Sequence, residues 1–70
     1  MSYAKRKYYV NSAVDADRDV HHEDCTSLPE PDNRKYLGEF YSCIVAVVTA
    51  VRMYPTANGC KICSPECHIE

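Results

Sequence analysis

The first hydrophobic pattern in the chain lies in residues 7–11, KYYVN, where aromatic and β-branched side chains predominate. These residue types are typical of β-strands, in which successive side chains point to opposite faces. We therefore predict a strand over residues 7–11, with Tyr8 and Val10 on one face and Tyr9 on the other.

Similar patterns predict two further short strands. The acidic residues 12–19 indicate a turn, and residues 19–22, DVHH, indicate a strand that returns beside the first one. Residues 26–34 contain two prolines together with Asp and Asn, which is typical of a loop. Residues 35–41, KYLGEFY, predict a third strand, in which Gly38 is the unfavourable position.

The longest apolar segment, residues 42–54, predicts a helix. An uninterrupted run of this length favours a helix over a strand, despite its many β-branched residues. Ser42 can cap the N-terminus, Arg52 would lie in the last turn, and Pro55 would end the helix. Four aliphatic residues are expected to form the face that packs in the core: Ile44, Val47, Val48 and Val51.

These elements define an α+β fold class. We expect two or three short antiparallel strands packed on one helix, at about residues 42–54, in a single small domain. The domain spans residues 1–70, with an ordered core at about residues 7–65. At 70 residues, a hydrophobic core alone gives marginal stability, and such chains often add disulfides, a metal ion or a second subunit.

The net charge of the chain indicates which class of partner to expect. Ten acidic and eight basic residues give a formal net charge of −2, whereas nucleic-acid-binding domains usually carry a basic stripe. A nucleic-acid partner is therefore not expected, and protein is the expected partner class. Dimerisation through the apolar helix is an alternative way to support the core.

The apolar run also bears on localisation. Residues 43–51 are too few to cross a bilayer, which requires about 20 residues. The basic residues 5–7 are not followed by the apolar segment of a secretory signal. We therefore expect a cytoplasmic protein without a membrane partner.

The C-terminal segment GCKICSPECH, residues 59–68, contains three cysteines and one histidine. Cys60 and Cys63 have the C-x2-C spacing with which two thiolates chelate one metal ion from a tight turn. Upstream, in HHEDC, either His21 or His22 can pair with Cys25, and two distant ligand pairs are the usual plan of a structural zinc site. Seven cysteine and histidine side chains outside the predicted helix compete for the four positions of a tetrahedral site: His21, His22, Cys25, Cys60, Cys63, Cys67 and His68.

Two other uses of these cysteines are disfavoured. A thioredoxin-like redox pair requires C-x2-C at the N-terminus of a helix that follows a strand, whereas Cys60 and Cys63 follow the predicted helix. A nucleophilic enzyme requires a base beside a thiolate in a substrate cleft, and nothing in the sequence indicates one. We therefore expect no catalytic residue. Cys43 is expected to be a packed thiol of the core.

The ligand spacing resembles the small zinc-binding domain at the N-terminus of the bacterial DNA-repair alkyltransferase Ada, and short stand-alone domains related to it. The matching segments are VHHEDC (20–25), YLGEF (36–40), the Ala/Val-rich helix and GCKICSP (59–65). The resemblance implies four zinc ligands: His21, Cys25, Cys60 and Cys63. It departs from the family pattern at His21, where Ada has a cysteine, and at Gly59, where proline usually precedes the knuckle.

Together these observations predict a structural zinc-binding domain that acts as a small interaction module. The alternative is an Ada-like DNA-repair or thiolate-transfer module that uses a zinc-bound cysteine. In Ada, the cysteine at the first ligand position accepts a methyl group from a DNA phosphotriester. His21 removes the thiolate from that position, which favours the binding module over the enzyme.

Overall fold

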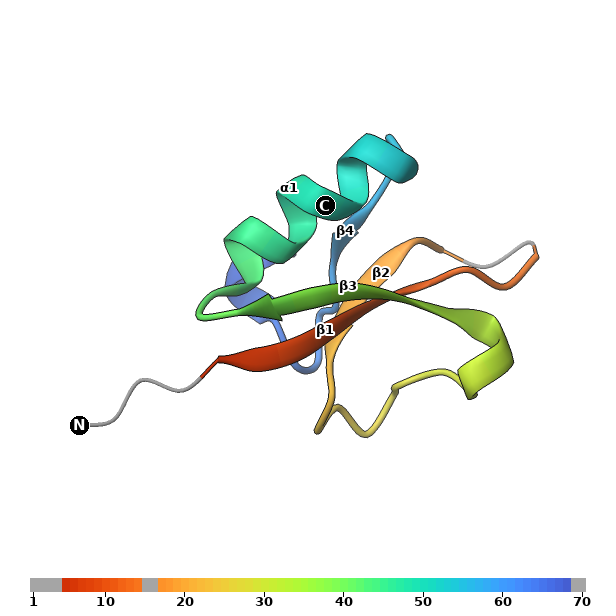
Figure 1. The fold of residues 1–70 in the computed structure, drawn as a ribbon, viewed down its shortest axis with the longest axis horizontal. Helices are drawn as coiled ribbons and strands as arrows, with labels where there is room; N and C mark the ends of the chain where they lie inside the picture. Colours follow the sequence, from red (N-terminus) through yellow and green to blue (C-terminus); the bar gives the residue numbers. More distant parts are fainter. Residues whose placement is uncertain (1–4, 15–16, 69–70) are drawn as a thin grey trace.

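The computed structural model describes residues 5–14 and 17–68, in which four strands form one sheet (Figure 1). Residues 15–16 of the predicted turn at 12–19, and both ends of the predicted domain, lie outside the described residues. The strand order is β3-β1-β2-β4. The strand bounds are Arg6–Asn11 for β1, Asp19–His22 for β2, Arg34–Phe40 for β3 and Asn58–Gly59 for β4.

The helix α1, Cys43–Met53, lies on one side of this sheet, and the loop between β2 and β3 lies on the other (Figure 1). That loop ends in a short 3-10 helix, η1, Pro31–Asn33, and a second one, η2, Pro65–Cys67, follows β4. The α+β fold class is therefore confirmed. The fourth strand was not predicted, because its two residues, Asn58 and Gly59, are of types that are typical of turns.

β1 and β2 form an antiparallel hairpin whose inner face is buried. Val10 pairs with Val20, and Tyr8 pairs with His22 two positions along. The side chains of Val10 and Val20 are 0% exposed, and that of Tyr8 is also buried. The predicted faces of β1 are confirmed, since Tyr9 is only half-buried and pairs its ring with Tyr36 of β3.

Gly38, the unfavourable position of the predicted third strand, lies next to a β-bulge. Tyr8 pairs with Gly38 while the next residue, Tyr9, pairs with Tyr36, so Leu37 is an extra residue in β3. Such a β-bulge bends the strand and increases its twist. The backbone of Gly38 has φ of 130°, a conformation that side-chain-bearing residues rarely adopt.

The helix begins and ends as the sequence predicts. The hydroxyl oxygen of Ser42 accepts a hydrogen bond from the Ile44 backbone N–H at 3.0 Å. At the other end, the Tyr54 N–H donates to the Ala50 carbonyl, and Pro55 follows. No helix in the described part of the chain has the length and apolarity needed to cross a membrane.

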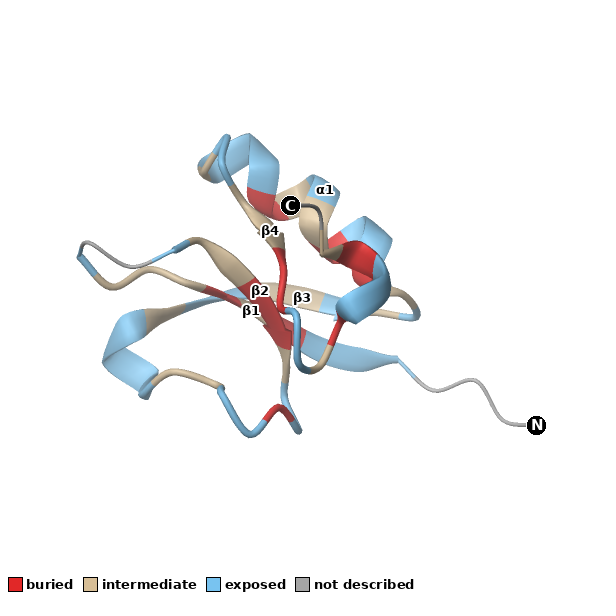
Figure 2. Cartoon of the chain, turned by 180° about the vertical axis from the view of Figure 1, so that it is seen from behind, coloured by how far each residue is buried: buried red, intermediate tan, exposed pale blue. Residues whose placement is uncertain are grey.

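The predicted core face of α1 is wrong for three of its four residues. Ile44 is 65% and Val48 52% exposed, and Val51 is also exposed. The helix instead buries Cys43, Ala46 and Ala50, and Val47 packs beside them (Figure 2). Residues at these spacings share one face of a helix, and their small side chains allow the helix backbone to approach Val10 and Val20 of the sheet.

Cys43 is buried as predicted, but it is not a free thiol. A disulfide joins it to Cys67 of η2. This bond links the first turn of α1 to the segment after β4, across 24 residues of sequence. The link could not be predicted from the local pattern, because it depends on how the two segments pack. Disulfides that close loops of this size typically stabilise a fold by about 2–4 kcal/mol.

The corrected core can be tested with two valine substitutions. Val10→Ala removes two methyl groups from a fully buried position and should lower the free energy of unfolding by about 2 kcal/mol. Val48→Ala, at an exposed position of α1, should change it by less than about 0.5 kcal/mol. Chemical denaturation followed by circular dichroism would measure both. Equal losses would mean that α1 packs through the face that the sequence pattern first indicated.

Candidate metal centre

The two halves of the candidate site meet because β4 pairs with β2. This pairing is parallel, with Val20 opposite Gly59. The Cys60 N–H donates a hydrogen bond to the Val20 carbonyl at 2.9 Å. Cys60 therefore lies directly beside His21, the residue after Val20, although 39 positions separate the two in the sequence.

The turn that follows β2 supplies the other ligand of the first half. The Cys25 N–H donates to the His22 carbonyl at 3.0 Å, which turns the chain back toward β2. As a result the Cys25 sulfur lies 3.4 Å from Nδ1 of His21 and 3.9 Å from the Cys60 sulfur. His21, Cys25 and Cys60 are buried, and Cys63 is half-buried.

Potential ligand atoms of all four residues lie within 4.8 Å of one another, so this cluster could hold a metal ion. Zn–S bonds of about 2.3 Å and Zn–N bonds of about 2.0–2.1 Å in a tetrahedral site place two sulfurs about 3.8 Å apart and a sulfur and a nitrogen about 3.5 Å apart. The two distances in the structure, 3.9 Å and 3.4 Å, agree with these values. The donor set therefore fits zinc without rearrangement of these pairs.

Local hydrogen bonds organise the knuckle between Cys60 and Cys63. The Ser64 N–H donates to the Cys60 carbonyl at 2.8 Å and closes the turn. The Ile62 N–H points inward and lies 3.4 Å from the Cys60 sulfur. This contact helps to hold the Cys60 sulfur within the turn of the knuckle. The sequence signal for this contact is the C-x2-C spacing itself.

Burial sets the protonation of two of the candidate ligands. It lowers the pKa of His21, in the same direction as the neighbouring His22, while Asp19 opposes the shift. The lowered pKa keeps the imidazole neutral, as a metal ligand must be. Burial also raises the pKa of the Cys25 thiol to about 12, and its hydrogen bond with Cys63 adds to this increase. A nearby cation would reverse that preference, because a metal ion binds the thiolate.

The other three candidates lie outside this cluster. His22 Nδ1 accepts a hydrogen bond from the Asp24 N–H, and His68 Nδ1 lies 3.0 Å from the Gly59 carbonyl oxygen. Cys67 is engaged in the disulfide. The structure thus brings together the four residues that the resemblance implies, His21, Cys25, Cys60 and Cys63, and places the competing side chains elsewhere.

One further group of potential metal ligands was not predicted from the sequence. Cys43, Glu66 and Cys67 also place ligand atoms within 4.8 Å of one another. Glu66 had no distinguishing signal in the sequence, since it is one carboxylate among ten acidic residues. Glu66 is a potential ligand only because η2 packs against α1, which brings its carboxylate close to Cys43.

Comparison of the chain with known protein families, with curated proteins and with solved structures found no match. The structure shows a small α+β fold with a cysteine–histidine cluster that could hold a metal ion.

The protonation of these ligands predicts the pH dependence of metal binding. Because thiol protons must leave when the metal binds, lowering the pH from about 8 to about 6 should weaken zinc affinity at least about tenfold per pH unit. His21 acts in the same direction. Its pKa in the fold lies below the unfolded value of about 6.5. The contribution of the neutral imidazole to the stability of the fold is therefore complete above about pH 6.5 and is lost as the pH falls below it. Competition with a chromogenic chelator across this range would measure the effect, and a flat profile would exclude thiolate ligation.

Proposed function

We propose that this chain is a structural zinc-binding domain and that His21, Cys25, Cys60 and Cys63 are its ligands. The observation that carries the proposal is the convergence of three thiols and one imidazole, from two distant segments, at separations that suit one tetrahedral ion. Thiolate and imidazole donors favour zinc over magnesium or calcium, which prefer oxygen ligands.

A structural role follows from the donor set. Four protein side chains fill all positions of a tetrahedral site, whereas a catalytic zinc site keeps one position for water or substrate. The bound ion would link the turn after β2 to the turn after β4. We therefore propose no enzymatic activity for the site itself.

We further propose that the domain acts as a small interaction module with protein as its partner class. Two observations support this: the net charge is −2, and the outer face of α1 is apolar at several exposed positions. A surface of this kind lacks the charge that supplies most of the non-specific affinity for DNA.

Metal dependence is the direct test of the proposed site. Protein purified without chelator should contain one zinc ion per chain, and cobalt should replace it with the visible d–d bands of a tetrahedral thiolate site. Cys60→Ser should abolish these bands. Lys61→Ser, an exposed position within the same knuckle, is the matched control and should leave them unchanged.

The same sample tests whether the ion is structural. Removal of zinc by a strong chelator should collapse the dispersion of the amide NMR spectrum, because a domain of this size depends on its cross-links. If the metal-free spectrum stays dispersed and unchanged, zinc is not required for folding.

The Ada-like alternative has one observation in its favour. Cys63 is half-buried, whereas Cys25 and Cys60 are buried, so it is the most exposed of the three cysteines in the cluster. The first ligand position opposes this alternative, because His21 is not a thiol and is only 3% exposed. In the resembling family, the methyl-accepting cysteine occupies that position.

We expect neither methyl transfer nor appreciable duplex binding at physiological salt. The zinc-loaded protein should keep its mass after incubation with DNA that carries methyl phosphotriesters, as measured by intact mass spectrometry. Addition of one methyl group, mapped to Cys25, Cys60 or Cys63, would establish the repair module instead. Cys63→Ser would then identify whether the most accessible thiol is the acceptor.

A further inference from the structure

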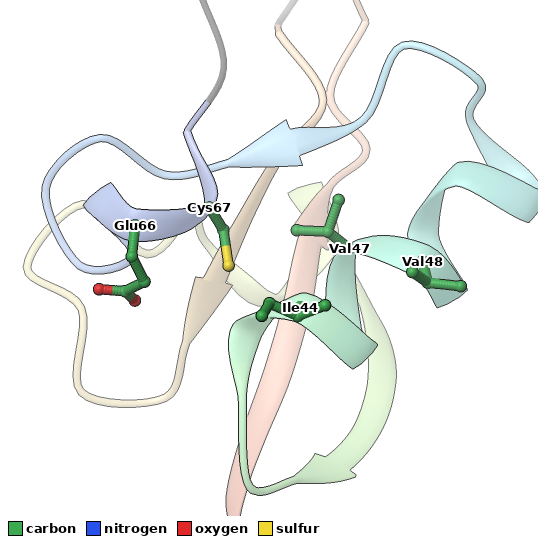
Figure 3. Close-up of a pocket in the computed structure, with 5 residues that line it drawn as sticks. All are labelled: Ile44, Val47, Val48, Glu66 and Cys67. Atoms are coloured by element: carbon green, nitrogen blue, oxygen red, sulfur yellow. The ribbon is translucent and has the colours of Figure 1, made fainter.

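A second cluster of metal-binding side chains lies where η2 packs against α1. Glu66 and Cys67 project from η2, and Ile44, Val47 and Val48 from α1, around a groove of about 210 Å³ (Figure 3). Cys43, in the first turn of α1, is bonded to Cys67 at the wall of this groove. The proposed zinc ligands do not include any of these residues.

The position of Glu66 points to a state in which the disulfide is open. Its Oε1 lies 3.2 Å from the Cys43 sulfur, which is hydrogen-bonding distance for a thiol donor. In the disulfide, however, that sulfur carries no proton to donate. The contact becomes favourable when Cys43 is a thiol, or when a cation lies between the carboxylate and a thiolate.

We propose that reduction of the Cys43–Cys67 disulfide creates a second metal site, formed by Cys43, Cys67 and Glu66. The disulfide holds the Cys43 and Cys67 sulfurs together, Glu66 Oε1 lies 3.2 Å from the Cys43 sulfur, and ligand atoms of all three residues lie within 4.8 Å of one another. Two thiolates and one carboxylate suit a borderline-soft divalent ion such as zinc. Water supplies the fourth donor, because the described residues place only three ligands at this position.

Reduction of the Cys43–Cys67 disulfide requires a reductant, which is a phosphine or a dithiol. A phosphine and one water molecule convert the disulfide into two thiols and a phosphine oxide, so the disulfide gains two electrons and two protons. The zinc ion then binds the two sulfurs, and both thiol protons pass to solvent. Glu66 binds as the carboxylate and releases no proton at neutral pH.

The disulfide and the second metal are thus alternative cross-links between the same two segments. Oxidising conditions join α1 to η2 through the sulfur–sulfur bond, and reducing conditions join them through the ion. The first site is independent of this exchange, because Cys25, Cys60 and Cys63 are free in the structure.

Native mass spectrometry with zinc(II) alone, on oxidised and phosphine-reduced full-length chain, tests the proposal. Alkylation under denaturing conditions confirms that reduction adds two thiols. The expected result is one more zinc ion per chain after reduction than before it. An unchanged stoichiometry after complete reduction overturns the proposal.

Variants separate the two sites. Glu66→Gln should weaken the additional zinc at least about tenfold, while Glu39→Gln, an exposed carboxylate on β3, should have no effect. Cys43→Ser should lose the additional ion and keep the first one. If the oxidised chain binds no zinc but reduction still adds one ion, the first site fails and the second stands. If Glu66→Gln and Glu39→Gln behave alike, the carboxylate is not a ligand and the proposed three-residue site is wrong.

Discussion

The parallel pairing of β4 with β2 is the constraint on which the candidate metal centre depends. It consists of only two strand residues, held by hydrogen bonds from Asn58 to the Arg18 carbonyl and from Cys60 to the Val20 carbonyl. The pairing brings Cys60 beside His21. The packing of η2 against β4 in turn requires glycine at position 59, because a Cβ there would lie 2.5 Å from that of Cys67, which forms the disulfide.

So small a sheet and helix cannot rely on hydrophobic burial alone. The two largest fully buried apolar side chains are valines, and the helix contributes a cysteine and two alanines to the core. Core residues of this size remove little apolar surface from water. Cross-links act differently. A disulfide restricts the unfolded chain, whereas a metal ion that binds only the folded chain adds its binding free energy to the stability of the fold.

Local features of the fold were predictable, and features that depend on long-range packing were not. Aromatic and β-branched residue types located β1, and the Ser42 cap and Pro55 located α1, because these signals act within a few residues. The buried face of α1 was mispredicted because hydrophobicity favoured Ile44 and Val48, whereas the close approach of helix and sheet selects the small Ala46 and Ala50. Similarly, β4 and the disulfide are defined by partners far away in the sequence. The four residues of the candidate site were named from spacing and resemblance, whereas their convergence became visible only in the fold.

The five cysteines show how geometry alone separates chemically identical side chains. Cys43 and Cys67 are joined by a disulfide across the contact between α1 and η2, whereas the sulfurs of Cys25 and Cys60 lie 3.9 Å apart. That separation matches two ligands that share one ion. A metal ion held by Cys25 and Cys60 would in turn protect these thiols from oxidation by occupying their lone pairs. The two cross-links can therefore coexist in one chain, because they use different cysteines.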